Sequence, residues 1–191
     1  HRQIRELIKL LRKKSKIIMR VYEPHISKYD DLIDAYTLKS NESAGGFGQY
    51  SSLDLLTKFK KITDKPLIPQ GGIGTSTQIK ELLNNGAEAV GIGTRFAISN
   101  ESMLSNPAKL AIVNSNTSDL VTLEDTCQRA IIFNKDEIDL TFNKSAWNRD
   151  ELLHEGVKTG KTGLVYVGNA IDQITKIASV EEIVEELVKD L

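Results

Sequence analysis

The sequence is poor in cysteine, histidine, proline and net charge. Its 191 residues include one cysteine, three histidines and four prolines. Because Cys127 is alone, the chain can form neither an internal disulfide nor a cysteine-based zinc site, so we predict no metal centre and a cytoplasmic protein. The formal net charge of −1 gives no electrostatic reason to expect nucleic acid or an anionic membrane as a partner. No apolar run approaches the ~20 residues of a membrane span.

What is present is an alternation of strand and helix patterns. After a helix over 2–13, we expect strands over 16–22, 37–43, 65–69 and 87–93, and helices over 27–36, 51–63 and 75–86. Short connections between alternating elements predict parallel strands joined by right-handed crossovers. An open doubly wound sheet and a (β/α)8 barrel both fit. Short strands followed directly by glycines favour the barrel, whose functional loops lie at the carboxyl ends of the strands.

The alternation fades after residue 97. Helix patterns cover 106–115, 145–157 and 179–191, and β-rich patterns cover 119–143 and 162–171. We therefore expect one partial α/β domain over 1–191. Within it, β/α barrel units occupy 15–97, and an α+β extension of the same domain occupies 98–191.

Three glycine corners follow expected strands, at 44–46, 71–74 and 91–94. Glycine lets a loop turn sharply and approach a ligand closely. Loop N–H groups with a helix N-terminus behind them form an anion site, and barrels often bind phosphate between the loops after their last two strands. The hydroxyl of Thr94 and the charge of Arg95 would add to such a site. The alternative is that these glycines only form tight turns and helix ends.

The stretch "PLIPQGGIGTSTQIKELLNNGAEAVGIGTRFAISNES" closely resembles the nitronate monooxygenase family, which includes FMN-dependent enoyl-acyl-carrier-protein reductases. The matching motifs are Pro66 to Ile73, Gly93 to Phe96, and Glu101-Ser102. Weaker similarity extends upstream to "SAGG" and downstream to "GLVYVGNAIDQITKIASVEEIVEEL". The resemblance implies a (β/α)8 barrel with FMN at its C-terminal mouth and NAD(P)H as a candidate reductant.

The resemblance also implies which residues contact FMN. Glycine loops would hold its phosphate, and residues of the first corner and of a later turn would lie beside its ring system. By motif position these cofactor-binding residues are Ser40, Gly45, Gly46, Gly71, Gly72, Gly91, Ile92, Gly93, Thr94, Gly168 and Asn169.

One departure from the family concerns proton transfer. The family carries a catalytic histidine after its first glycine corner, where this sequence has Phe47. Phenylalanine cannot move a proton, and general acid/base help is worth roughly 10²–10⁴ in rate. The chain therefore keeps a base-free reaction, places its proton donor elsewhere, or has lost this chemistry. His25, after the first strand, is the best substitute candidate, ahead of Tyr50 and Glu42; a surface loop histidine is the alternative reading.

A second departure is that the resemblance begins in the middle of the family's barrel, so only strands five to eight are expected. A half barrel needs a partner, either the missing N-terminal half or another subunit, and we expect the chain to be a segment of a longer protein.

The leading hypothesis is an FMN-dependent oxidoreductase that oxidises alkyl nitronates. The alternatives are an enoyl-acyl-carrier-protein reductase acting on an acyl thioester, a non-catalytic flavin-binding module, and a barrel for another phosphate compound.

Overall fold

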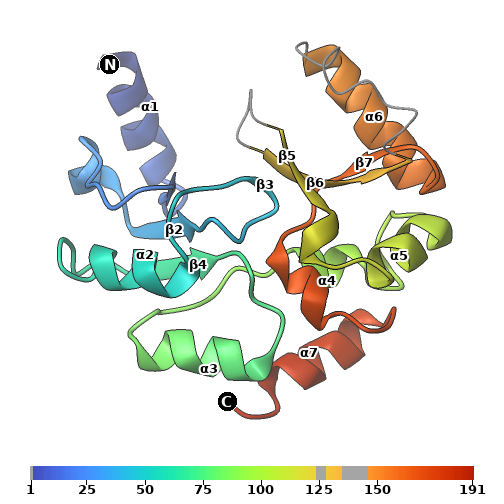
Figure 1. The fold of residues 1–191 in the computed structure, drawn as a ribbon. Coiled ribbons are helices and arrows are strands. Elements are labelled where there is room, and N and C mark those ends of the chain that lie inside the picture. The colour runs from blue at the N-terminus through green and yellow to red at the C-terminus, as the bar shows by residue number, and fades with distance from the viewer. Residues whose placement is uncertain (1, 124–127, 135–145) are drawn as a thin grey trace.

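The computed structural model describes residues 2–123, 128–134 and 146–191 (Figure 1). It is an α/β protein with one parallel and one antiparallel sheet, which confirms the predicted class and the parallel strands. The described elements are α1 Arg2–Arg12, β1 Ile18–Val21, η1 Asp30–Leu32, β2 Ala35–Lys39, β3 Gly45–Gly46, α2 Ser52–Phe59, β4 Leu67–Gln70, α3 Ser76–Asn84, α4 Thr94–Ala97, α5 Asn106–Val113, η2 Thr117–Asp119, β5 Leu120–Leu123, β6 Gln128–Phe133, α6 Ala146–Thr159, β7 Gly163–Val165, η4 Asn169–Gln173 and α7 Val180–Val188. Among the described helices, none is both long and apolar enough to span a membrane.

The parallel sheet has the strand order β1-β2-β4, and a single parallel bridge between Gln70 and Gly91 continues it. Its strands alternate in burial. On β2, Tyr36 and Leu38 are fully buried and belong to the same apolar cluster as residues of α2, whereas Thr37 and Lys39 on the opposite face are only half-buried. This second face also carries the exposed Ile18 of β1. Only one face of the parallel sheet is therefore well covered within the described chain.

The antiparallel sheet joins the two halves of the chain. β6 pairs with β5, with β7 and with the two-residue strand β3, which lies within the first glycine corner. Helix α6 packs on β7, and α7 lies against α3 and α4 (Figure 1). The C-terminal half is thus attached to the parallel sheet both at the first glycine corner and beneath α3.

Several expected boundaries are wrong. The helix expected over 27–36 is only the short turn η1, because the backbone N–H groups of Asp34 and Ala35 bond to the carbonyl oxygen of Ile17 and the chain enters β2 at Ala35. Parallel pairing with β1 overrides the local helix pattern there, and it moves the strand expected over 37–43 upstream. The strand expected over 87–93 is reduced to the one bridge at Gly91.

The helix ends follow their sequence signals. Ser51 caps α2 by accepting a hydrogen bond from the N–H of Asp54. Thr75 and Gln78 form a capping box on α3, and Ser179 and Glu182 form another on α7. These caps fix where the helices that support the sheet begin.

A buried tyrosine connects the core to the loop after β1. The hydroxyl of Tyr36 donates to Asp30 Oδ1 at 2.7 Å and accepts from the N–H of Ser27 at 3.2 Å. Its ring packs against Phe59, with ring centroids 5.5 Å apart. Burial and the neighbouring Asp30 raise the pKa of Tyr36 to about 12. The hydroxyl therefore stays protonated and holds this loop to the sheet.

We expect Tyr36→Phe to lower the free energy of unfolding by about 1–3 kcal/mol, because it leaves the buried N–H of Ser27 without an acceptor. Urea denaturation of the variant and the parent protein measures this difference. Tyr22→Phe, at a tyrosine that is 38% exposed, is the matched control and should change stability by less than about 0.5 kcal/mol. Equal losses in both variants would contradict the role given to Tyr36.

Candidate functional site: a glycine-lined cavity at the strand ends

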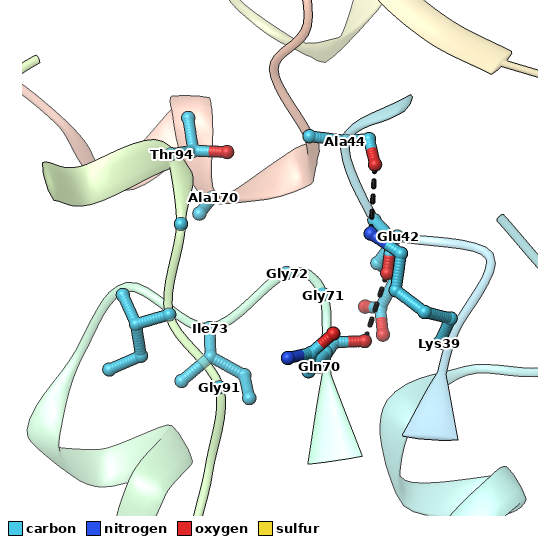
Figure 2. Close-up of a pocket in the computed structure, with 13 residues that line it drawn as sticks. Lys39, Glu42, Ala44, Gln70, Gly71, Gly72, Ile73, Gly91, Thr94 and Ala170 are labelled. Carbon is cyan, nitrogen blue, oxygen red and sulfur yellow. Dashed lines mark hydrogen bonds between the residues drawn. The ribbon is translucent and has the colours of Figure 1, made fainter. Parts of the chain in front are cut away.

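The three glycine corners meet at the carboxyl ends of β2 and β4 (Figure 2). They enclose a cavity of about 120 Å³. Its walls come from the end of β2, the first corner, the loop after β4, the loop before α4 and the turn η4, and its lining residues are Lys39, Glu42, Ser43, Ala44, Gln70, Gly71, Gly72, Ile73, Gly91, Ile92, Gly93, Thr94 and Ala170. Six of the sequence-predicted cofactor residues thus share one cavity.

The second corner needs its glycines. Gly71 and Gly72 have φ angles of 115° and 71°, a left-handed conformation that side chains disfavour. A Cβ on Gly71 would lie 2.8 Å from the backbone nitrogen of Ser43, and one on Gly72 would lie 2.9 Å from Glu42 Cβ. The hydroxyl of Ser43 donates to the carbonyl oxygen of Gln70 at 2.9 Å, which ties the first corner to the second.

The third corner is more open. The N–H of Gly91 donates to the carbonyl oxygen of Pro69 at 2.8 Å, which holds the corner beside β4. A Cβ on Gly93 would meet no atom within 4 Å. Within the described chain, the N–H groups of Gly72, Gly93 and Thr94 have no protein acceptor. Three backbone donors at one cavity are suited to an anionic oxygen group.

A turn from the C-terminal half supports the first and third corners. The N–H of Gly168 donates to Thr94 Oγ1 at 3.0 Å, and the N–H of Asn169 donates to the carbonyl oxygen of Glu42 at 2.9 Å. A Cβ on Gly168 would lie 2.8 Å from the backbone nitrogen of Ala44, so only glycine permits this close approach. The predicted pair Gly168-Asn169 therefore lies behind the cavity rather than in its lining.

Phe47, at the position where the family has histidine, packs against an arginine. The guanidinium carbon of Arg129 lies 4.8 Å from the Phe47 ring centroid. The same guanidinium donates to the carbonyl oxygen of Asn41 and, at 2.8 Å, to Asn169 Oδ1. Burial lowers the pKa of Arg129, an effect opposed by the negative charge of Glu42. Arg129 thus joins β6 to both the first corner and the supporting turn.

Two ionisable side chains line the cavity. Lys39 Nζ donates to the carbonyl oxygen of Ala44 at 2.9 Å (Figure 2). Glu42 Oε2 accepts from the N–H of Ser52 at the start of α2, at 2.9 Å. The Glu42 charge is therefore stabilised by the N-terminus of α2, while Lys39 faces the cavity beside Gln70, its direct neighbour across the sheet.

Other predicted residues lie elsewhere. His25 is exposed in the loop after β1 and is not part of the cavity lining. The ring of Tyr50 lies against the ammonium group of Lys58 and is not part of the lining either.

Ser40 is fully buried behind Gly71, where its Oγ accepts from the N–H of Glu42 at 3.2 Å. Arg95, expected to add its charge to the cavity, is instead buried in an ion pair with Glu186 of α7.

The remaining expectations concern Gly45, Gly46 and metal ligands. Gly45, with a φ of 60°, and Gly46 form β3 and pair with β6 outside the cavity lining. In the described chain, no three His, Cys, Asp or Glu side chains gather as a metal site would require. Cys127 lies outside the described residues.

Sequence reasoning missed Lys39 and Gln70 as lining residues. Both lie one position before a predicted feature: Lys39 precedes Ser40, and Gln70 precedes Gly71. Their register pairing in adjacent parallel strands places them side by side. The strand boundary expected at residue 43 hid this placement, because the side chains at a strand's carboxyl end can be identified only when that end is known.

Comparisons with known proteins identify a family and solved structures of similar fold. The family model for nitronate monooxygenase matches residues 33–190. FabK from Thermotoga maritima is 26% identical, with a TM-score of 0.80 over 97% of this chain and 64% of that one. A point mutant of the same FabK is 25% identical, with a TM-score of 0.82 over 97% of this chain and 63% of that one.

A nitroalkane oxidase from Streptomyces ansochromogenes is 20% identical and shows likeness of fold alone, with a TM-score of 0.80 over 98% of this chain and 60% of that one. The chain thus spans less than two thirds of the length of these solved structures. No curated protein matches the chain significantly.

We expect Gly72→Ala to lower the free energy of unfolding by about 1–3 kcal/mol, because alanine at a φ of 71° is strained and its Cβ would press on Glu42. Gly93→Ala is the matched control, since its φ is −123° and its Cβ would enter open space. Urea denaturation should place Gly93→Ala within about 0.5 kcal/mol of the parent protein. If Gly72→Ala were as stable as Gly93→Ala, the claim that the backbone at Gly72 disfavours a side chain would be wrong.

Proposed function

Because this chain belongs to the nitronate monooxygenase family, we propose that it is part of an FMN-dependent oxidoreductase that oxidises alkyl nitronates. The observation that carries the proposal is the convergence of two consecutive glycine corners on one cavity at the carboxyl ends of parallel strands. The unpaired N–H groups of Gly72, Gly93 and Thr94 would bind the FMN phosphate.

The size and shape of the cavity support a phosphate site rather than a pocket for the whole cofactor. Its volume of about 120 Å³ is well below the ~300–1,000 Å³ of pockets that enclose a complete ligand. The phosphate end would therefore occupy the part of the cavity beside Gly72, Gly93 and Thr94, and the remainder of FMN would extend beyond it. A Cβ on Gly93 would meet no atom within 4 Å, so the backbone at this position is open to a ligand atom.

Phe47 determines which substrates the proposal includes. When bound, FMN supplies the redox chemistry, and the protein supplies position and charge. Oxidation of a neutral nitroalkane needs a base to remove the α-proton, and Phe47, packed against Arg129, offers none. A nitronate has already lost that proton, so it needs no base. The substrate class that fits this chain is therefore the anionic nitronate.

An enoyl-acyl-carrier-protein reductase is the second candidate, and the likeness to FabK favours it. Its substrate would be an acyl thioester, and NAD(P)H would be the reductant. Enoyl reduction requires a proton donor for the α-carbon, which the nitronate reaction does not. The non-catalytic flavin-binding module is the outcome expected if neither reaction occurs.

The exposed face of the parallel sheet supports a proposal about how the enzyme is completed. Ile18 on β1 is 54% exposed, and β1 is an edge strand of the sheet. Parallel sheets are normally covered on both faces. We propose that further β/α units, from the same polypeptide or another subunit, pair with this edge and complete a (β/α)8 barrel.

Absorption spectroscopy tests the proposal. We expect the intact protein to bind FMN in equimolar amount and to be bleached anaerobically by an alkyl nitronate but not by NAD(P)H. Bleaching by NAD(P)H would favour the reductase, and a bound flavin reduced by neither would favour the non-catalytic flavin-binding module.

Gly93→Ala should weaken FMN binding at least about 10-fold, because its Cβ enters the space assigned to the phosphate. Unchanged affinity would exclude this phosphate position.

A second substitution tests the role of Phe47. We expect Phe47→His to raise the oxidation rate of neutral nitroalkanes by about 10²-fold, because histidine can accept the α-proton. The rate with the preformed nitronate should stay within a few-fold of the parent value. Phe47→Leu, which removes the aromatic ring without adding a base, is the control. An equal rise in this rate with leucine and with histidine, or no rise with either, would contradict the claim that the parent protein lacks a base at position 47.

A further inference from the structure

Lys39 is the one cation among the described cavity-lining residues. It is the last residue of β2, on the half-buried face of the sheet, and it pairs in register with Gln70. Within the described chain, its ammonium group donates one hydrogen bond, to the carbonyl oxygen of Ala44 at 2.9 Å. An ammonium group has three donors, so two remain for a ligand.

The described chain provides Lys39 with no carboxylate partner at ion-pair distance. Glu42 shares the cavity, but its Oε2 is bonded to the N–H of Ser52. Burial lowers the pKa of Lys39, and the nearby positive charge of Arg20 on β1 lowers it further. A half-buried cation next to a like charge and without a counter-ion is a costly arrangement that a bound anion would relieve.

We propose that Lys39 binds the anionic head group of the substrate, a nitronate, through its ammonium group. The inference rests on the proposed function and assigns substrate recognition to a residue next to the phosphate-binding loops. The free donors of Lys39 would hold a nitronate oxygen, and its charge would offset the negative charge of the substrate. Neutral nitroalkanes lack that charge, so Lys39 would select the ionised form over the neutral one.

A merely structural role is the competing explanation, since Lys39 also supports the carbonyl of Ala44. Such a role predicts that removing the ammonium group lowers stability and FMN affinity, with no separate effect on anions. Substrate recognition predicts that, in the protein saturated with FMN, nitrate affinity falls in Lys39→Met but not in Lys39→Arg. The two roles are therefore distinguishable by binding measurements without turnover.

The experiment is a calorimetric titration of the intact protein, first with FMN and then, in the FMN-saturated protein, with nitrate. Nitrate is planar like the head group of a nitronate and carries the same charge. The variants are Lys39→Met, which removes the charge, and Lys39→Arg, which keeps it. Lys60→Met is the matched control, because Lys60 likewise donates to a backbone carbonyl, that of Asn85, but lies outside the cavity.

We expect nitrate affinity to fall at least about 10-fold in Lys39→Met, to stay within about 3-fold in Lys39→Arg, and to be unchanged in Lys60→Met. Because only the ammonium form attracts an anion, nitrate affinity of the parent protein should fall as the pH rises through the lowered pKa of Lys39. The other charged groups near Lys39 are Arg20 on β1 and the cavity residue Glu42. Equal nitrate affinity in the parent and Lys39→Met, or no nitrate binding by the parent, overturns the inference.

Failure of the proposed function gives a different result. If the protein takes up no FMN, the proposed function falls, and nitrate is titrated into the FMN-free parent and Lys39→Met proteins. A nitrate affinity that depends on Lys39 would then preserve the anion site, and an affinity independent of it would remove both conclusions.

Discussion

The site depends on the parallel pairing of β2 with β4. That pairing places Lys39 beside Gln70, and the bridge from Gln70 to Gly91 adds the third chain segment in the same direction. Since all three segments run parallel, their carboxyl ends lie at one edge, and the glycine corners that follow them enclose one cavity. Buried Tyr36 and Leu38, packed against α2, hold β2 in this register.

The C-terminal half of the chain stabilises the corners from behind. The Gly168-Asn169 turn bonds to Thr94 and to the carbonyl oxygen of Glu42, and Arg129 bonds to that same turn. The cavity is therefore built by loops from the parallel sheet and supported by a turn and an arginine from the C-terminal half of the chain. We propose two anions for this site, a phosphate group at the backbone N–H groups and a nitronate at Lys39.

The sequence predicted the helices α2, α3 and α7 well, because serine or threonine caps and an apolar stripe define them locally. It also located Gly71 and Gly72, whose φ angles favour glycine, and Gly91, which approaches the Gln70 side chain closely. Sequence-based prediction failed where contacts between distant segments determine the secondary structure or the partner of a side chain. The segment 27–36 becomes a turn and a strand, and Arg95 is drawn to Glu186 of a distant helix. Lys39 was missed because its importance depends on the register of β2.

The central claim is that backbone N–H groups at these corners bind the phosphate of a flavin. Comparing the affinities of the intact protein for FMN and for riboflavin tests it most directly, because the two ligands share the ring system and differ in the phosphate. The account predicts equimolar FMN binding and an affinity for riboflavin at least about 100-fold lower, a loss of roughly 2.7 kcal/mol. Equal affinities for the two ligands, or no binding of FMN, would contradict it.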